Sequence, residues 1–170
     1  SKVERGAIQS KYFTSGSLVY RNQARLSSEL VAKISKIYVQ EGDQVDIGQE
    51  LVKLDDVSVR AEIAQAEAQL ARARIDVMRL ERELESKHSD WLRILELQSK
   101  GMVSKQAAEL AHVTFDSARF QLEANRKNAI QEEAALSQKM KLLEKTVIRS
   151  PIRGVVIAIP MKVGETAVAS

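Results

Sequence analysis

The side chains best suited to bind a partner lie in one short stretch, WLRILELQSKGMVSKQ, in the middle of the chain. Arg93 presents a planar fork of donors that suits carboxylates and backbone carbonyls. Leu97 lies four residues on, hence on the same helix face, and adds apolar contact area. Two interpretations stay open at this point: both residues meet one partner surface, or Arg93 is a solvated surface residue and Leu97 closes the end of a helix pair.

The same stretch contains the signals of a turn between two helices. Gly101 suits the left-handed position that ends a helix. The hydroxyl of Ser104 can cap the next helix by accepting a hydrogen bond from a free backbone N–H. Residues between them would occupy the apex. The candidate binding residues of this tip are Arg93, Leu97, Lys100, Gly101, Met102, Val103 and Ser104.

Residues that serve catalysis or metal binding are scarce elsewhere. His88 and His112 each stand without a second ligand at helical spacing, so we expect no metal site. Cysteine is absent, which excludes disulfides and thiolate ligands. The chain has no phosphate-binding glycine loop and no recognisable nucleophile–base pair. We therefore expect neither an enzyme nor a bound cofactor.

Charge and hydropathy narrow the classes of partner. The net charge is +3, and basic and acidic residues are interleaved rather than gathered in a basic stripe, so we expect no nucleic-acid binding. No apolar run approaches the roughly 20 residues of a membrane span. The chain opens at Ser1, so we expect any membrane anchor to lie outside it.

Two long helices must carry the tip. Residues 57–146 contain no proline and one glycine, and Asp55 and Asp56 favour a helix start just before them. Apolar residues recur at alternating spacings of three and four, which predicts an antiparallel coiled-coil hairpin over 57–146 with its tip near 99–104. The predicted seam is Ile63, Ala66, Leu70, Ala73, Val77, Leu80, Leu84, Trp91 and Ile94 on the first arm and Phe115, Ala118, Leu122, Asn125, Ala129, Leu136 and Leu143 on the second. Each arm spans roughly 60 Å, so the hairpin must project.

Strand chemistry flanks the hairpin on both sides, at 23–56 and 147–170. When Gly164 is set against Gly42, the segment KIYVQEGDQV aligns with AIPMKVGETA. Because the two copies of this short repeat lie on either side of the hairpin, we expect them to be the halves of one small β-domain. A further strand is expected within residues 1–22.

This arrangement resembles the periplasmic adaptors of bacterial tripartite efflux and secretion systems, the membrane fusion proteins of the hemolysin D type. The matching segments are VERGAIQSKYFTSGSLV, AKISKIYVQEGDQVDIGQELVKLDD and TVIRSPIRGVVIAIPMKVGETA. The resemblance implies an α+β fold, a split biotinyl/lipoyl-like β-sandwich interrupted by the hairpin. It identifies residues 1–22 as the strand that leads from a largely absent β-barrel. Ala32 departs from the glycine often found there in the family.

The resemblance also implies a function. Arg93, Leu97 and Ser104 match the spacing of the Arg–Leu–Ser motif with which such adaptors meet a TolC-like outer-membrane channel. It implies an inner-membrane pump of RND or ABC type as second partner and self-association into a ring, usually a hexamer. The protein would be periplasmic and anchored to the inner membrane.

Two alternatives belong to other functional classes. The hairpin suits a coiled-coil scaffold unrelated to export. A biotin or lipoyl carrier would need its modified lysine at an exposed turn, and Lys53 lies near the hairpin but within the strand-like segment LVKLDD.

Overall fold

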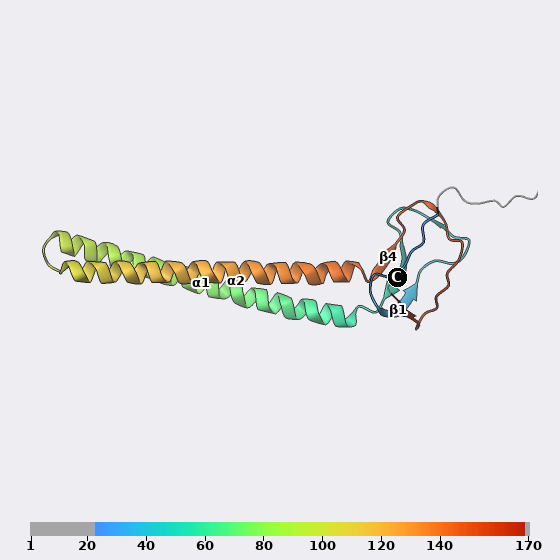
Figure 1. The fold of residues 1–170 in the computed structure, drawn as a ribbon, viewed down its shortest axis with the longest axis horizontal. Coiled ribbons are helices and arrows are strands. Elements are labelled where there is room, and N and C mark those ends of the chain that lie inside the picture. Colours follow the sequence, from blue (N-terminus) through green and yellow to red (C-terminus); the bar gives the residue numbers. More distant parts are fainter. Residues whose placement is uncertain (1–22, 169–170) are drawn as a thin grey trace, which may run out of the picture.

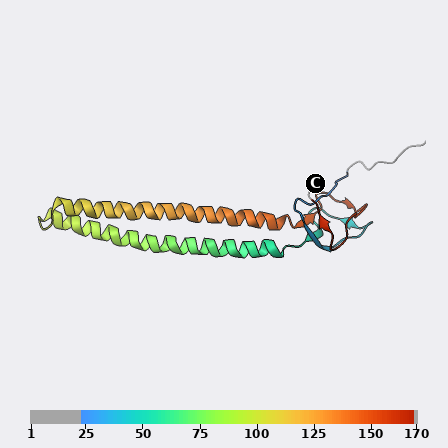
Figure 2. The same cartoon turned by 60° about the horizontal axis from the view of Figure 1, so that its bottom comes forward.

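A computed structural model describes residues 23–168; the strand expected at 1–22 lies outside that part of the chain. A long helical hairpin projects from one small β-domain, and both helices leave from the same side of it (Figures 1 and 2). The elements are β1 (Ala32–Ile37), β2 (Gln44–Val45), β3 (Glu50–Leu54), α1 (Val57–Ser99), α2 (Lys105–Glu144), β4 (Val147–Arg149), β5 (Gly154–Val155) and β6 (Thr166–Ala167). The expected α+β class and the split sandwich interrupted by a hairpin are confirmed.

Strands from the two sides of the hairpin share both sheets. One sheet has the order β4-β3-β1-β6 and the other pairs β2 with β5, so every sheet contains strands from before and after the helices. All the pairings are antiparallel. Neither half can form these ladders alone, because the partner of each short strand β5 and β6 belongs to the other half.

The short sequence repeat is visible in the strand register. Aligning Gly42 with Gly164 sets Ala32 against Gly154 and Val45 against Ala167. Ala32 is paired with Ala167 across β1 and β6. The counterpart that the repeat requires, Val45 paired with Gly154, is present across β2 and β5. The two halves are therefore related by an approximate two-fold axis.

The two glycine turns obey the same relation. Gly42 and Gly164 have φ values of 94° and 90°, a left-handed conformation in which a side chain would be strained. The Gly42 N–H donates to the carbonyl of Val156 at 2.8 Å, and the Gly164 N–H donates to the carbonyl of Ile34 at 2.9 Å. Each turn is thus tied to the strand of the opposite half.

The apolar core of the β-domain is divided in the same way. One cluster contains buried Ile34, Leu54 and Ala167, and the other contains buried Val39, Val45 and Leu51. Leu54 is the most completely buried hydrophobic residue of the part of the chain that the structure describes, at 0% exposure, and it ends the strand that runs into α1.

The hairpin seam lies where the sequence predicted it. Every seam position expected on either arm is buried or half-buried, and the fully buried ones on α1 are Ala66, Leu70, Ala73 and Leu80. Lys87, where the apolar series is interrupted, is half-buried at the seam spacing. Alanines on both helices, with Ala108 and Ala118 on α2, allow a close approach of the arms.

Candidate functional site: the hairpin tip and its root

The first half of the tip is a glycine-ended helix terminus. Gly101 has φ 72°, as expected for a left-handed helix end. Its N–H donates to the carbonyl of Gln98, and the Met102 N–H donates to the carbonyl of Leu97, both at 2.9 Å. This pair of bonds is a Schellman motif, which satisfies carbonyls that the end of α1 would otherwise leave free.

Ser104 begins α2 as the sequence predicted. Its backbone is extended, with φ −74° and ψ 156°, and its Oγ accepts a hydrogen bond from the Ala107 N–H at 3.2 Å. A serine hydroxyl keeps its own proton and a second lone pair after accepting one bond. Because Ser104 is exposed, its hydroxyl remains available to a partner while it caps the helix.

The other candidate residues surround this turn at different depths. The Arg93 side chain is 68% exposed and its guanidinium pairs with Asp90, one turn earlier on the same helix. Leu97 is half-buried, whereas Met102 is 69% exposed at the apex. Val103 is half-buried, Gly101 is exposed, and Lys100 is exposed with its Nζ 2.6 Å from Glu96.

Beneath the tip, four rings hold the arms together. Trp91 of α1 stacks on Phe115 of α2, with ring centroids 5.2 Å apart and planes 16° apart. His112 lies 4.7 Å from Trp91, and His88 lies 5.1 Å from Phe115. Trp91 was expected in the core and is half-buried there, whereas the gathering of both histidines around it was not predicted. A sequence period relates residues along one helix, so it does not predict which residues of the two arms contact each other.

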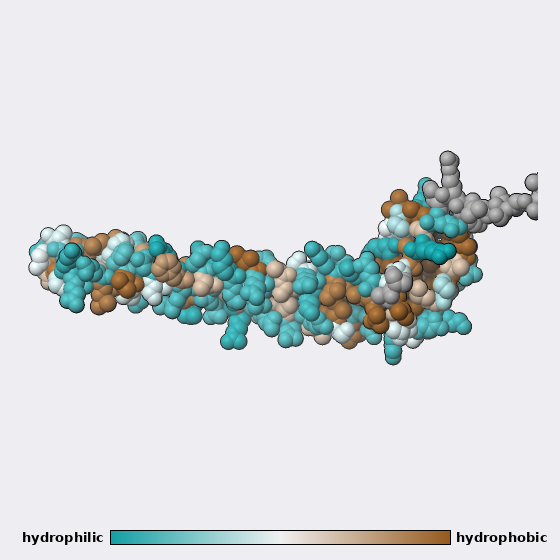
Figure 3. All heavy atoms as spheres, viewed as in Figure 1, coloured by the Kyte–Doolittle hydropathy of each residue, from teal (hydrophilic) through white to brown (hydrophobic). Residues whose placement is uncertain are grey.

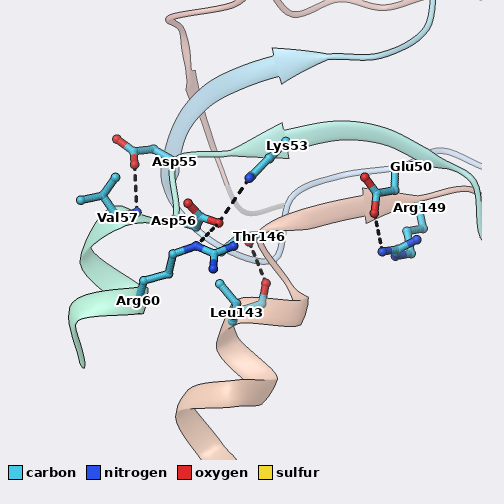
Figure 4. A network of polar contacts seen from close by, with 9 residues as sticks. All are labelled: Glu50, Lys53, Asp55, Asp56, Val57, Arg60, Leu143, Thr146 and Arg149. Carbon is cyan, nitrogen blue, oxygen red and sulfur yellow. Dashed lines mark hydrogen bonds and ion pairs between the residues drawn. The ribbon is translucent and has the colours of Figure 1, made fainter. Parts of the chain in front are cut away.

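At its other end, the root, α1 is joined to the sandwich by a charged cluster (Figure 4). Asp56, whose side chain is 12% exposed, accepts a hydrogen bond from the Arg60 Nε at 2.8 Å and lies 3.5 Å from the Lys53 Nζ. Burial alone would raise the pKa of Asp56, but the hydrogen bond from Arg60 and the charges of Arg60 and Lys53 outweigh it and lower that pKa below its ordinary value. Asp55 also contributes, because its carboxylate accepts a hydrogen bond from the Val57 N–H at 3.1 Å.

The return arm is fixed by a buried threonine. Thr146 is 1% exposed, and its Oγ1 donates to the carbonyl of Leu143 at 2.7 Å. The Leu54 N–H in turn donates to the carbonyl of Thr146 at 2.8 Å. The exit from β3 and the entry to β4 are therefore bonded to each other, so the two arms leave and rejoin the β-domain at neighbouring points (Figure 4).

Three further observations bear on what the described residues of the tip and the root could do. Among residues 23–168, no group of three or more His, Asp or Glu side chains lies close enough together to hold a metal ion. None of the helices in that part of the chain is sufficiently long and apolar to cross a membrane. Lys53 lies inside β3 with Asp56 beside it, not at the apex of a turn.

Comparison with known proteins agrees with this architecture. A family model described as "RND MFP, barrel-sandwich hybrid domain" matches residues 22–170. The multidrug export protein EmrA of Haemophilus influenzae is 28% identical over 187 residues, covering 89% of this chain and 47% of its own length. A crystal structure of MacA from Actinobacillus actinomycetemcomitans superposes with a TM-score of 0.82 at 25% identity, covering 86% of this chain and 45% of that one.

A further solved structure shares the fold. The membrane fusion protein Spr0693 of Streptococcus pneumoniae R6 matches with a TM-score of 0.59 at 22% identity, covering 81% of this chain and 52% of that one. The chain spans about half the length of these relatives. Since the family model covers nearly the whole chain, including both halves of the sandwich and the hairpin between them, the chain belongs to the RND membrane fusion protein family and comprises its barrel-sandwich hybrid domain.

Proposed function

We propose that this chain is the hub and docking arm of a periplasmic adaptor in a tripartite efflux or secretion complex. The hairpin tip docks on a TolC-like outer-membrane channel, and an inner-membrane pump of RND or ABC type supplies the energy. The adaptor itself is not an enzyme. A part of the protein outside this chain anchors it to the inner membrane.

The main support for this proposal is the position of the tip at the far end of the hairpin. Two helices of 43 and 40 residues hold the candidate residues roughly 60 Å from the sandwich. A helix pair of that length adds little to the packing of a small domain, whereas it provides reach. The relative named as a multidrug export protein and the solved membrane fusion proteins support an export role.

The tip also has suitable chemistry for docking. The guanidinium of Arg93 is paired only with an exposed aspartate of its own helix, so it can exchange that partner for a carboxylate or carbonyl on another protein at little cost. Met102 offers an exposed flexible apolar side chain, and Ser104 offers a hydroxyl. Arginine and apolar side chains with a polar rim are typical of protein interfaces.

The test replaces the two candidate residues in the full-length protein. We expect Arg93→Asp and Leu97→Asp to reduce export, measured as drug susceptibility or secretion, to the level of a strain that lacks the protein. Lys141→Asp is the matched control for Arg93→Asp, because it makes the same charge change on an exposed position near the root. Export retained by both tip variants at normal protein levels would refute docking through these residues and favour the alternative, a coiled-coil scaffold unrelated to export.

The proposal includes self-association into a ring, a hexamer in the full complex.

The carrier alternative has a separate test, since biotin or lipoyl attached to Lys53 would appear in the intact mass of the natively produced protein. We expect the unmodified mass, because the Lys53 Nζ is engaged by Asp56 and its side chain is only 33% exposed.

A further inference from the structure

The oxidisable sulfur atoms of this chain all belong to methionine, because cysteine is absent. Oxidation adds one oxygen atom to the sulfur and converts a flexible apolar side chain into a polar sulfoxide. The four methionines lie in different surroundings: Met78 on α1, Met102 at the tip, Met140 on α2 and Met161 in the β-domain. The consequence of oxidation therefore depends on which sulfur is attacked.

Met102 is the most exposed of the four. Its exposed fraction is 69%, against 56% for Met78 and 52% for Met140, whereas Met161 is half-buried against a core cluster of the β-domain. Hydrophobic side chains reach the surface of the hairpin at intervals, between hydrophilic ones (Figure 3). An oxidant dissolved in water reaches an exposed sulfur directly, whereas a covered sulfur reacts only when the fold opens around it. Met102 is thus open to oxidation in the native protein.

The fold of the tip does not depend on the side chain of Met102. The turn is held through the backbone, where the Met102 N–H donates to the carbonyl of Leu97 at 2.9 Å. The Gly101 N–H donates to the carbonyl of Gln98, also at 2.9 Å. The cap at Ser104 then starts α2 through its own hydroxyl. None of these bonds uses the sulfur, so a sulfoxide at Met102 changes the surface of the tip and leaves the turn in place.

Oxidation of Met161 would have a different result. Its side chain packs against the core cluster of Ile34, Leu54 and Ala167, so a sulfoxide there would place a polar oxygen beside a small apolar core. Damage to the core affects the fold itself. An exposed sulfoxide at Met102, by contrast, is accessible to a methionine sulfoxide reductase, which removes the oxygen with a dithiol as the reductant.

We propose that Met102 is a site of reversible oxidation that turns docking of the hairpin tip off. One oxygen atom passes from hydrogen peroxide or hypochlorous acid to the Met102 sulfur. The sulfur is oxidised to the sulfoxide, and the oxidant is reduced to water or to chloride and a proton. The inference rests on the proposed function, to which it adds a means of regulating the same site.

The sulfoxide weakens docking because of the change in polarity. An apolar side chain such as Met102 gains free energy when a partner covers it. A sulfoxide oxygen loses bound water on being covered, which is unfavourable unless the partner offers a hydrogen-bond donor in its place. A partner that covers Met102 also shields its sulfur, so docking in turn protects the tip from the oxidant.

Peptide mass analysis of the purified full-length protein tests the chemistry. During brief treatment with dilute hydrogen peroxide, we expect the peptide that contains Met102 to gain the mass of one oxygen atom several-fold faster than the peptide that contains Met161. Methionine sulfoxide reductase with dithiothreitol should then restore the mass of the Met102 peptide. Oxidation of Met102 no faster than that of Met161 would overturn the proposal.

A variant that imitates the sulfoxide tests the consequence. Glutamine has a length close to that of methionine and a polar oxygen near its end, so Met102→Gln resembles the oxidised tip. We expect this variant to bind the isolated TolC-like channel about ten-fold more weakly than the wild type, the factor that ~1.4 kcal/mol gives. Met78→Gln and Met140→Gln are the matched controls, because they make the same change at exposed positions away from the tip, and they should bind like the wild type.

Replacement by leucine keeps the position apolar and removes the sulfur. Each full-length variant is compared with itself before and after treatment with peroxide. The treatment should weaken channel binding of the wild type, of Met78→Leu and of Met140→Leu, and it should not change the binding of Met102→Leu. An equal loss in Met102→Leu would contradict the proposal, since the oxidation of another residue would then be responsible.

These results can be told apart from those of the docking test. If Arg93→Asp and Leu97→Asp abolish export while Met102→Gln and peroxide leave channel binding unchanged, docking stands and its regulation by oxidation is refuted. If the Met102 variants behave as expected while Arg93→Asp and Leu97→Asp retain export, oxidation regulates a contact made by the apex alone. A wild-type protein that does not bind the channel would refute the proposed function and the oxidation site with it.

Discussion

The two ends of the hairpin are built by different means. At the root, Leu54 is fully buried, Thr146 is 1% exposed, and the bond between them crosses from one half of the sandwich to the other. At the tip, every hydrogen bond that shapes the turn joins residues close in sequence, and Met102 stands 69% exposed. The root thus fixes the direction in which the arm points, whereas the tip is a self-contained turn whose side chains are free for contact.

The largest expected effect lies at the root. Leu54→Ala removes a fully buried side chain from a small core, and we expect the β-domain to lose about 2–5 kcal/mol of its free energy of unfolding. Hydrogen exchange at the amides of β1 and β3 measures this loss. Met102→Ala at the tip should change the same amides by less than about 0.5 kcal/mol. Equal losses of stability in the two variants would contradict the view that the root, and not the tip, stabilises the β-domain.

The aromatic cluster should stabilise the tip half of the hairpin and not the root. Trp91→Ala removes the stack on Phe115, and we expect the distal amides of α1 and α2 to lose about 2 kcal/mol of protection, because the half-buried ring contributes both area and ring contacts. Trp91→Phe keeps a ring at this position and should retain most of the stability. Equal loss of protection at β1 and β3 would contradict a local role.

The turn itself should give a smaller effect. Gly101→Ala places a side chain at φ 72°, which costs about 1 kcal/mol although nothing lies within 4 Å of the added carbon. Fluorescence of Trp91, the only tryptophan of the chain, follows urea unfolding of the surrounding hairpin. Lys100→Ala is the neighbouring control, with an ordinary backbone conformation and only an exposed ion pair to lose. A cost no greater for Gly101→Ala than for Lys100→Ala would show that the left-handed turn is unimportant.

The smallest effect concerns the charge of Asp56 at the root. Its pKa is lowered in the folded protein, so the folded state favours its ionised form, and the stability this gives is present above about pH 4. As the pH falls through the lowered pKa, the carboxylate is protonated and that contribution is lost. The difference in unfolding free energy between the wild type and Asp56→Asn should therefore be constant from pH 7 to about 4.5 and shrink below that. A difference that grew on acidification would contradict the sign of the shift.

The contrast between the ends also explains what the sequence could predict. Gly101 and Ser104 act through bonds to residues three to five positions away, so their residue types alone indicated a helix end and a cap. The seam was predictable for the same reason, since a period of three and four is a local property. The short repeat predicted that the two halves form one domain, and the strand register agrees with it.

Contacts between residues far apart in the sequence could not be predicted from such local patterns. The bond from Leu54 to Thr146 joins positions on either side of the hairpin, and neither residue type suggests a partner. The four-ring cluster likewise needs both arms in register. The sequence analysis named no exposed apolar residues on α2, although Leu110, Val113 and Phe120 lie outside the predicted seam and are 67%, 63% and 64% exposed. The docking role of the tip residues remains a prediction.

The closeness of the two points where the chain leaves and re-enters the sandwich has a consequence for how such proteins change. The hydrogen bond between Leu54 and Thr146 closes the base of the hairpin. The packing of the sandwich therefore does not depend on the number of residues in the two helices between them. Adding one heptad to each arm would extend the hairpin by about 10 Å while keeping the seam in phase. The length of the hairpin can therefore change in steps of one heptad per arm without any change in the sandwich that carries it.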